Sequence, residues 1–490
     1  MVKAYQMLID GKWVDSVSGC VFESENPYTG KVWATLPRAT PEDVDAAMEA
    51  ADRAFNGVWA EYTATQRGQL LYKLGELISQ NAERLAEIEV QDNGKLLSEM
   101  KAQLSYLPKY FYYYAGLADK IEGAVIPSDN KAHFNFTRRE PLGVVLAITA
   151  WNSPLLFFAL KAAPALAAGN TMVVKPSEFT SASMLELAAL ISQAGFPDGV
   201  VNVITGFGGE IGDSLVEHKK TAKIAFTGSD YTGARVSEKA AKNVVPVTME
   251  LGGKSANIVF ADAEIDNALN GVMAGIFGAG GQTCVAGSRL LVHKSIAGEF
   301  IERLVERSSQ IRLGDPRDPD TQMGPMSNKP HFEKVNRFFD IAVSDGAHVA
   351  LGGRPAALGG YFVEPTIYTG VANSMRIARE EVFGPLLAVI EFEEDDEAIS
   401  IANDCEYGLA AGVWTQDYRR MLRMSKSLRA GTVWANCYRT VSFTTPFGGC
   451  KRSGHGRESG MEAINAYLQT KSIWINTAEK VANPFVMAIG

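Results

Sequence analysis

The sequence lacks the cysteine spacing that disulfide frameworks and zinc sites require. Its 490 residues include only five cysteines, an odd number, and no two of them form a Cys-x-x-Cys pair. The six histidines are equally dispersed along the chain. We therefore expect neither a metal site nor a disulfide network, and a protein that resides in the reducing cytoplasm.

Long apolar runs and an excess of positive charge are also absent. The longest apolar stretch, Leu155 to Ala168, is interrupted by Lys161 and Pro164 and is too short to span a bilayer. The first residues, Met1 to Trp13, contain no apolar segment of the kind found in secretory signals. The formal net charge is −9, whereas a chain that binds nucleic acid needs a basic face. We expect neither a membrane nor a nucleic-acid partner.

The composition is that of an ordinary globular protein, and the chain is too long to form a single hydrophobic core. Hydrophobic residues make up 46% and charged residues 21%, and a chain of 490 residues is expected to form two or three domains. Short β runs alternate with helical patterns from residue 134, and a similar alternation resumes from Ala256 to about residue 436. This order predicts parallel sheets. We interpret the glycine pair in Glu250-Leu251-Gly252-Gly253 as the hinge between two α/β domains.

Three polar segments each follow a predicted strand, namely Trp151–Pro154, Lys175–Glu178 and Thr227–Ser229. Parallel sheets bind ligands at the carboxyl ends of their strands. We therefore expect all three segments at one ligand site. The last of them also opens a helix, where free N–H groups and the helix dipole can meet a pyrophosphate. On this evidence alone, an ordinary βα turn is the alternative.

Within the second segment, Lys175 and Glu178 are suited to hold ribose hydroxyls. A carboxylate there favours the free 2′-OH of NAD and repels the 2′-phosphate of NADP. The alternative is a solvated pair of charged loop residues. A glycine-rich segment, Gly206 to Gly212, resembles the dinucleotide fingerprint, but its third glycine falls one residue late. We interpret that segment as a turn.

One cysteine, Cys284, stands behind a run of small residues, Gly278-Ala279-Gly280-Gly281. Glycines allow a backbone to approach a ligand closely and leave the following side chain uncrowded. A thiol in such a place is a candidate nucleophile, because cysteine attacks as an accessible thiolate. The alternative is a buried structural cysteine beside a flexible turn.

Several segments resemble, in order, the motifs of the NAD(P)-dependent aldehyde dehydrogenase superfamily. The resemblance covers about residues 8 to 476, which is nearly the whole chain. The segments are Trp151-Asn152-Ser153-Pro154, Lys175-Pro176-Ser177-Glu178, Phe226-Thr227-Gly228-Ser229, Met249-Glu250-Leu251-Gly252-Gly253-Lys254, Gly281-Gln282-Thr283-Cys284, Glu380-Glu381-Val382-Phe383-Gly384-Pro385 and Pro446-Phe447-Gly448-Gly449.

The resemblance implies NAD-dependent oxidation of an aldehyde to the carboxylic acid. Cys284 would be the nucleophile that forms a thiohemiacetal and then a thioester. The side-chain amide of Asn152 and the backbone N–H of Cys284 would hold the oxyanion, where donors stabilise the developing charge. Glu250 would activate the water that hydrolyses the thioester, which suits a carboxylate whose pKa is raised by burial.

The resemblance also implies the cofactor NAD, with NADP as the alternative. Lys175 and Glu178 would hold the adenine ribose, and Glu381 would hold the nicotinamide ribose. The implied cofactor-binding residues are Trp151, Lys175, Glu178, Gly228, Ser229, Glu381 and Phe383.

Five residues match positions that line the substrate tunnel in relatives, namely Tyr106, Ser153, Phe157, Leu160 and Phe447. None of them is charged, so an apolar or aromatic aldehyde is easier to house than a semialdehyde that bears a carboxylate. The alternative is that these side chains simply pack the core.

The implied fold is α/β, with a Rossmann-like cofactor domain and a catalytic domain, both doubly wound, and a small protruding β element. We assign residues 1–120 and 141–252 to the cofactor domain and 253–452 to the catalytic domain. Residues 121–140 and 466–490 would form the oligomerisation element. Relatives pair through such a sheet, which implies a homodimer or a homotetramer.

Two other functions are compatible with this scaffold. In a CoA-acylating enzyme, CoA rather than water would take the acyl group, but such an enzyme does not need the base Glu250. A binding protein that has lost catalysis would be indicated by the loss of Cys284, Glu250 or Asn152, and all three are present. The sequence therefore favours the hydrolytic enzyme.

Overall fold

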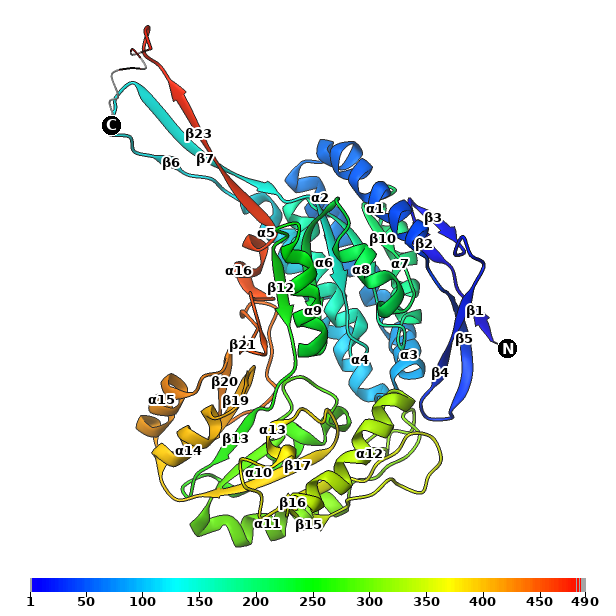
Figure 1. The fold of residues 1–490 in the computed structure, drawn as a ribbon, viewed down its shortest axis with the longest axis vertical. Helices are drawn as coiled ribbons and strands as arrows, with labels where there is room; N and C mark the ends of the chain where they lie inside the picture. The colour runs from blue at the N-terminus through cyan, green and yellow to red at the C-terminus, as the bar shows by residue number, and fades with distance from the viewer. Residues whose placement is uncertain (1, 482, 484, 486–490) are drawn as a thin grey trace.

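The computed structural model describes residues 2–481, 483 and 485 and shows two large α/β bodies and a thin sheet that protrudes from one of them (Figure 1). The remaining residues of the predicted oligomerisation element, 482, 484 and 486–490, lie outside the described part of the chain. The predicted fold class, two doubly wound α/β domains with a small β element, is confirmed.

The first body is built on an eight-stranded sheet whose five central strands are parallel. Its strands in spatial order are β22 (Gly454–His455), β12 (Val247–Glu250), β11 (Thr221–Thr227), β8 (Val144–Ile148), β9 (Thr171–Lys175), β10 (Val201–Val203), β2 (Met7–Ile9) and β3 (Lys12–Val14). The edge strands β22, β2 and β3 pair antiparallel.

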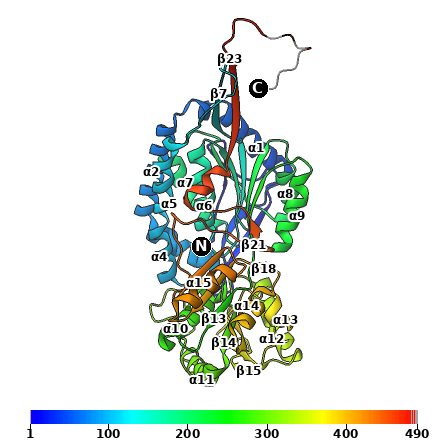
Figure 2. The ribbon, with the colours of Figure 1, turned by 90° about the vertical axis from the view of Figure 1, so that its left-hand side faces the viewer.

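Alternate residues of these strands pack against helices on opposite faces of the sheet. In β8, Val145 and Ala147 belong to one hydrophobic core, and Val144 and Leu146 belong to the other. This alternation follows from the two-residue period of a strand, and it makes both faces apolar, as a parallel sheet requires. Figure 2 shows α8 and α9 on one side of the sheet and α2, α5 and α7 on the other.

The helices of the first body begin at residues that favour helix starts. Asp43 accepts a hydrogen bond from the backbone N–H of Thr40 at 2.8 Å, and Pro41 occupies the first turn. The helical segments are α1 (Pro41–Asn56), η1 (Val58–Glu61), α2 (Ala64–Gln80), α3 (Ala82–Asn93), α4 (Leu97–Tyr106), α5 (Pro108–Leu117), η2 (Ala118–Lys120), α6 (Pro154–Ala168), α7 (Ala182–Ala194), α8 (Gly208–Val216), α9 (Asp230–Ala241) and α16 (Gly460–Asn465).

The second body contains a seven-stranded sheet in which all strands but the edge strand β15 run parallel. The strands in spatial order are β15 (His348–Leu351), β16 (Thr366–Thr369), β17 (Leu386–Phe392), β14 (Arg289–His293), β13 (Ala256–Val259), β19 (Ala410–Trp414) and β20 (Thr432–Ala435). The helical segments around this sheet are α10 (Ile265–Ile276), η3 (Gly278–Gly281), α11 (Lys294–Ser309), α12 (Lys329–Ser344), α13 (Arg376–Arg379), α14 (Asp395–Asn403) and α15 (Tyr418–Ser427).

Three smaller sheets complete the structure. The protruding sheet consists of β23 (Leu468–Asn476), β7 (His133–Pro141) and β6 (Val125–Ile126), and Figure 1 shows it extending away from both bodies. The other two sheets are formed by β1 (Lys3–Ala4), β5 (Lys31–Pro37) and β4 (Val21–Asn26), and by β18 (Tyr407–Gly408) and β21 (Cys450–Lys451).

The chain crosses between the two large sheets where the glycine pair predicted a hinge. Strand β12 ends at Glu250 in the first sheet, and β13 begins at Ala256 in the second. The interpretation of Gly206–Gly212 as a turn is wrong, because α8 begins at Gly208. Among the helices of the described residues, none is both long and apolar enough to cross a membrane.

Candidate active site

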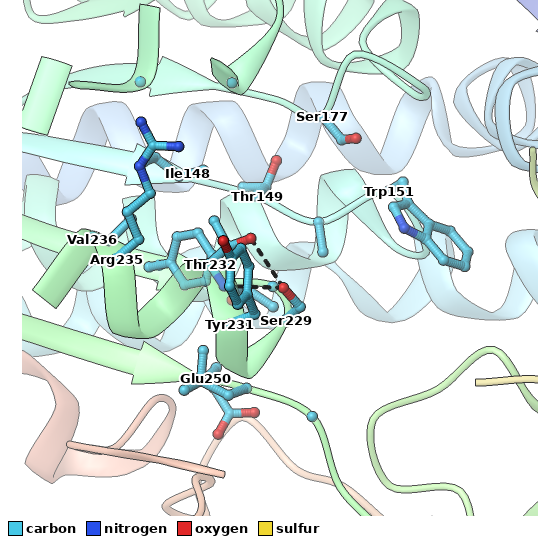
Figure 3. Close-up of a pocket in the computed structure, with 18 of the residues that line it drawn as sticks. Ile148, Thr149, Trp151, Ser177, Ser229, Tyr231, Thr232, Arg235, Val236 and Glu250 are labelled. Carbon is cyan, nitrogen blue, oxygen red and sulfur yellow. Dashed lines mark hydrogen bonds between the residues drawn. The ribbon is translucent and has the colours of Figure 1, made fainter. Parts of the chain in front are cut away.

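A cleft of about 470 Å³ lies at the carboxyl ends of the central strands of the first sheet and is lined by both large bodies. Figure 3 shows Trp151, Ser177 and Glu250 on segments that follow or end parallel strands of this sheet, β8, β9 and β12. Cys284 and Glu381 line the cleft from the second body. The structure therefore brings the segments predicted as one ligand site to one place.

The loop that carries Cys284 has a left-handed backbone conformation, which small residues, above all glycine, adopt most easily. Ala279, Gly280 and Gly281 have φ values of 54°, 60° and 71°. A Cβ atom added to Gly281 would lie 2.3 Å from the carbonyl oxygen of Gly384, so a side chain is excluded there. Consequently the loop turns sharply after α10 and places the half-buried Cys284 in the cleft.

Gln282, beside the cysteine, is hydrogen-bonded to Asn152 and to Ser327. Asn152 Nδ2 donates to the backbone oxygen of Gln282 at 3.0 Å, and Gln282 Oε1 accepts from the backbone N–H of Ser327 at 2.8 Å. The amide group of Asn152 has two N–H donors, so one donor is left for a ligand. Asn152 is 5% exposed, and this hydrogen bond fixes its orientation relative to the loop of Cys284.

Glu250 is a buried carboxyl group at the end of β12. Burial, together with the nearby charge of Glu458, raises its pKa well above the usual value, while Lys161 acts in the opposite direction. Within the described residues, Glu250 Oε1 is buried and has no hydrogen-bond partner. Burial also raises the pKa of the Cys284 thiol, with further contributions from Glu250 and Glu381. Both groups therefore favour their neutral forms.

Glu381 occupies the space that the hinge glycines leave open. Its Oε1 accepts from the backbone N–H of Gly253 at 2.8 Å, and a Cβ atom on Gly252 would lie 2.2 Å from its Oε2. Burial raises the pKa of Glu381 to about 7, although the N–H of Gly253 and Lys334 lower it. A side chain at position 252 would therefore displace the carboxylate of Glu381, so Glu381 can take this place only because residue 252 is glycine.

Three rings form a small apolar wall next to Glu381. The ring of Trp151 lies 5.0 Å from His331 and 5.2 Å from Phe383, measured between centroids. His331 Nε2 donates to the carbonyl oxygen of Phe383 at 2.7 Å, and Phe383 has a φ of 64°. Burial, with the charge of Lys334, lowers the pKa of His331 to about 3, so the imidazole is neutral. The sequence analysis did not identify His331.

The predicted ribose and pyrophosphate segments also line the cleft. Lys175 Nζ is 3.6 Å from Glu178 Oε2. Ser229 caps α9 by accepting from the backbone N–H of Thr232 at 3.2 Å, a bond drawn in Figure 3. Gly228 also lines the cleft.

The glycine-rich start of α8 lines the same cleft, through Gly208, Gly209 and Gly212. The signal for this contribution was in the sequence, because the segment follows a strand and precedes a helix, although its spacing departs from the fingerprint. The cleft is lined in addition by Ser177 of the predicted ribose segment, and by Thr149, Arg235, Lys239 and Lys334, which no motif indicated.

The residues predicted for the substrate pocket are found in different surroundings. Phe157 lines the cleft, Phe447 packs in the small apolar cluster next to Cys284, and the ring of Tyr106 lies 5.9 Å from Phe443. Leu160 is buried in the core of the first body and does not line the cleft.

The last predicted pocket residue, Ser153, touches a cation that sequence analysis missed. Lys95 Nζ donates to Ser153 Oγ at 2.8 Å, and Lys95 is 6% exposed. The predicted pocket residues are uncharged, but one of them, Ser153, contacts the charged side chain of Lys95. No motif indicated Lys95, because its position beside Ser153 depends on the packing of α3 and α4 against α6.

The fold and the cleft are those of a two-domain dehydrogenase. The chain belongs to the aldehyde dehydrogenase family, whose family model matches residues 13–473. Within the described residues, no three His, Cys, Asp or Glu side chains are grouped so that they could hold a metal ion.

Individual relatives are similar over their whole length. The chain is 47% identical to (Z)-2-((N-methylformamido)methylene)-5-hydroxybutyrolactone dehydrogenase of Acinetobacter baylyi, over 99% of this chain and 100% of that one. It is 43% identical to human (Homo sapiens) retinal dehydrogenase 2, over 98% and 93%.

Among solved structures, betaine aldehyde dehydrogenase of Staphylococcus aureus in complex with NAD+ is 41% identical and has a TM-score of 0.97, covering 98% of this chain and 97% of that one. The predicted family and the prediction of an NAD-dependent enzyme that acts on aldehydes are thereby confirmed, and the solved relative holds the predicted cofactor.

Proposed function

We propose that the protein oxidises an aldehyde to its carboxylic acid through a covalent thioester on Cys284. The observation that carries this proposal is that Cys284, Asn152 and Glu250, which come from distant parts of the chain, line one cleft. A nucleophile, an oxyanion donor and a base are the set that this reaction needs.

The proposed reaction begins when Cys284 loses its proton to solvent and becomes the thiolate. The sulfur adds to the carbonyl carbon, and the electron pair of the C=O bond moves to oxygen. The free N–H of Asn152 Nδ2 and the backbone N–H of Cys284 then donate to this oxyanion, which stabilises the tetrahedral adduct.

When bound, NAD would accept the hydride from this adduct, which leaves a thioester on Cys284. Glu250 then takes a proton from water as the water oxygen attacks the thioester carbon, and the acid leaves as the C–S bond breaks. The unpartnered Oε1 of Glu250 supports this role, because a water molecule can hydrogen-bond there. A base with a raised pKa is better matched to working pH.

The cleft fits NAD in two respects. Two carboxylates line it, Glu178 from the first body and Glu381 from the second, and each is suited to a ribose diol. The starts of α8 and α9 line the same cleft, where backbone N–H groups and helix dipoles favour a pyrophosphate. Glu178 supports NAD over NADP, because a 2′-phosphate would meet its negative charge.

A group of rings around Phe443, which includes the predicted pocket residue Tyr106, supports a substrate aldehyde with an apolar or aromatic body. Phe443 lies 5.9, 6.2 and 5.5 Å from the rings of Tyr106, Tyr110 and Tyr113, respectively. Such rings provide a large apolar surface for an unsaturated or aliphatic chain.

The proposed domains are residues 1–120 and 141–252 for the cofactor and 253–452 for catalysis. The strands within each range support this division, except that β22 (Gly454–His455), a strand of the first large sheet, falls outside both ranges. Residues 121–140 and 466–490 are proposed to form the oligomerisation element of a homodimer or homotetramer. Exposed apolar side chains on the protruding sheet support this role, because they would be buried in an interface; they are Val125, Ile126, Phe134, Trp474 and Ile475.

The test is reduction of NAD by a panel of aldehydes in the absence of CoA. Turnover by the wild type that disappears in Cys284→Ala supports the proposal. In Glu250→Gln we expect a burst of NADH close to one equivalent per subunit, followed by turnover slowed about a hundredfold or more. The matched control is Glu238→Gln, an exposed glutamate on α9. Turnover that requires CoA would contradict the hydrolytic step, and unchanged turnover in Cys284→Ala would contradict the nucleophile.

A further inference from the structure

A second large cavity lies at the base of the protruding sheet, where β7 leaves the first body (Figure 1). Its volume is about 490 Å³, close to the 470 Å³ of the active-site cleft, so a small organic molecule has room in it. Its walls come from α1, η1, α2, η2, the base of β7 and the end of α6. Among the described residues, none lines both this cavity and the active-site cleft.

Helix α6 separates the two cavities. It begins at Pro154, two residues after Asn152 of the active-site cleft, and ends at Ala168, which lines the second cavity. A helix of 15 residues is about 22 Å long. A ligand in the second cavity is therefore too far from Asn152 to take part in the reaction, and the cavity is a site of its own.

The guanidinium group of Arg67 is fixed at the wall of this cavity. Its Nε donates to the backbone oxygen of Ala167 at 3.2 Å, and its Nη1 donates to the backbone oxygen of Tyr62 at 2.9 Å. A Cβ atom on Gly169, which also lines the cavity, would lie 3.3 Å from Arg67 Cζ. Within the described part of the chain, Arg67 Nη2 donates to no acceptor. Arg67 is thus oriented before a ligand binds, which lowers the entropy cost of binding.

Two further arginines, Arg138 and Arg139 of β7, line the same cavity. Arg139 Nη1 donates to Thr470 Oγ1 at 2.6 Å. Arg138 forms no hydrogen bond with the described residues, and its nearest carboxylate oxygen, Glu140 Oε1, is 4.0 Å from its Nε. Most N–H groups of these two side chains therefore remain free for a ligand.

The positive charge of these arginines is not balanced by carboxylates. Among the described residues that line the cavity, the one carboxylate is Asp119, and its Oδ1 lies 2.5 Å from Lys120 Nζ. Glu140 Oε2 lies 2.5 Å from Lys471 Nζ. Each of these carboxylates is thus neutralised by its own lysine. The acidic residues of η1 and of the segment after η2 are exposed and do not line the cavity; they are Glu61 and Glu122.

We propose that this cavity is a second ligand site, which binds a small organic phosphate through Arg67, Arg138 and Arg139. A phosphate matches three guanidinium groups, because it carries up to two negative charges and three acceptor oxygens, and arginine binds it with two parallel hydrogen bonds. The apolar part of the ligand would contact Phe55 and Ile121, which line the cavity beside the arginines. This inference does not depend on the reaction proposed for Cys284.

The test is isothermal titration of the wild type with phenyl phosphate at low ionic strength, with NAD present at saturation. NAD occupies the active-site cleft, so the helix starts there cannot bind the probe. We expect about one phenyl phosphate per subunit with a Kd of about 1 mM or lower. Benzyl alcohol, which lacks the phosphate, should bind at least about tenfold more weakly, because hydrogen bonds between charged groups are the strong ones.

In Arg67→Met and in Arg138→Met we expect the Kd for phenyl phosphate to rise about tenfold. Arg67 also holds two backbone oxygens, whereas Arg138 holds none, so Arg138→Met separates binding from folding. The matched control is Arg312→Met, which removes a 61% exposed arginine of the second body and should leave the Kd unchanged. Turnover of NAD should be unchanged in all three variants.

Three results would overturn the inference. A wild type that does not bind phenyl phosphate excludes the site, and a change in the sedimentation of Arg138→Met would then indicate that a second copy of the chain fills the cavity. Binding with the same Kd in Arg67→Met and Arg138→Met would place the phosphate elsewhere. Benzoate that binds as tightly as phenyl phosphate, with the same dependence on Arg138, would show that the site does not select phosphate.

Discussion

Lys161 and Glu458 form a fully buried ion pair next to the strand that carries Glu250. Lys161 Nζ also donates to Thr227 Oγ1, and Thr227 is paired with Glu250 in the register of β11 and β12. The pair links α6 to the segment that follows β22, and the two charges act on the pKa of Glu250 in opposite directions.

The charge of Lys161 is expected to set the pH at which the proposed base works. The carboxylate form of Glu250 is the active form, so the rate rises with pH through its pKa. In Lys161→Met the cation that lowers this pKa is gone and Glu458 stays, so the profile should move to higher pH. We expect kcat to fall about tenfold at pH 7 and recover at higher pH.

The control for this prediction is Lys242→Met, which removes an exposed lysine that pairs with Glu217. Its pH profile should match the wild type. An equal loss of kcat at every pH in Lys161→Met would indicate misplaced groups rather than a changed pKa.

Gly252→Ala should weaken NAD binding, because the new Cβ would lie 2.2 Å from Glu381 Oε2 and displace that carboxylate. Overpacking of this kind costs about 1–3 kcal/mol, so we expect the KM for NAD to rise about tenfold. Gly116→Ala is the control: this exposed position in α5 has open space, and the change should raise stability by about 0.5–1 kcal/mol. An unchanged KM would show that Glu381 does not hold the cofactor.

Glu178→Ala should relax the choice between cofactors. Removing the carboxylate ends its repulsion of a 2′-phosphate and leaves Lys175, 3.6 Å away, free to attract one. We expect the ratio of kcat/KM for NADP to that for NAD to rise about tenfold or more. If the ratio stays at the wild-type value, the adenine ribose lies elsewhere in the cleft.

Trp474→Lys should disrupt the proposed oligomer. Trp474 is 61% exposed on β23, and a charge in an apolar interface opposes association. Sedimentation velocity should show a shift of the variant toward monomer. Tyr418→Lys, at a 63% exposed aromatic on α15, is the matched control and should sediment as the wild type does. A monomeric wild type would refute the role of the protruding sheet.

The sequence by itself determined the local parts of this protein. The short β runs from residue 134 onward and the small residues before Cys284 depend on neighbours in the chain, and the structure has both. The order of the strands and loops in turn predicted that the polar segments would share one edge of a sheet, as they do.

Only the tertiary structure decided which distant side chains meet. Lys161 and Glu458 are separated by 297 residues, and Gly253 and Glu381 by 128. The raised pKa of Glu250, the core position of Leu160 and the buried contact of Lys95 with Ser153 all arise from segments that pack together from far apart. The periodicity of a sequence predicts only structure formed by residues that are near one another in the chain. Burial and the effects of charge depend on residues that are close only in the folded protein, so the sequence pattern could not predict these features.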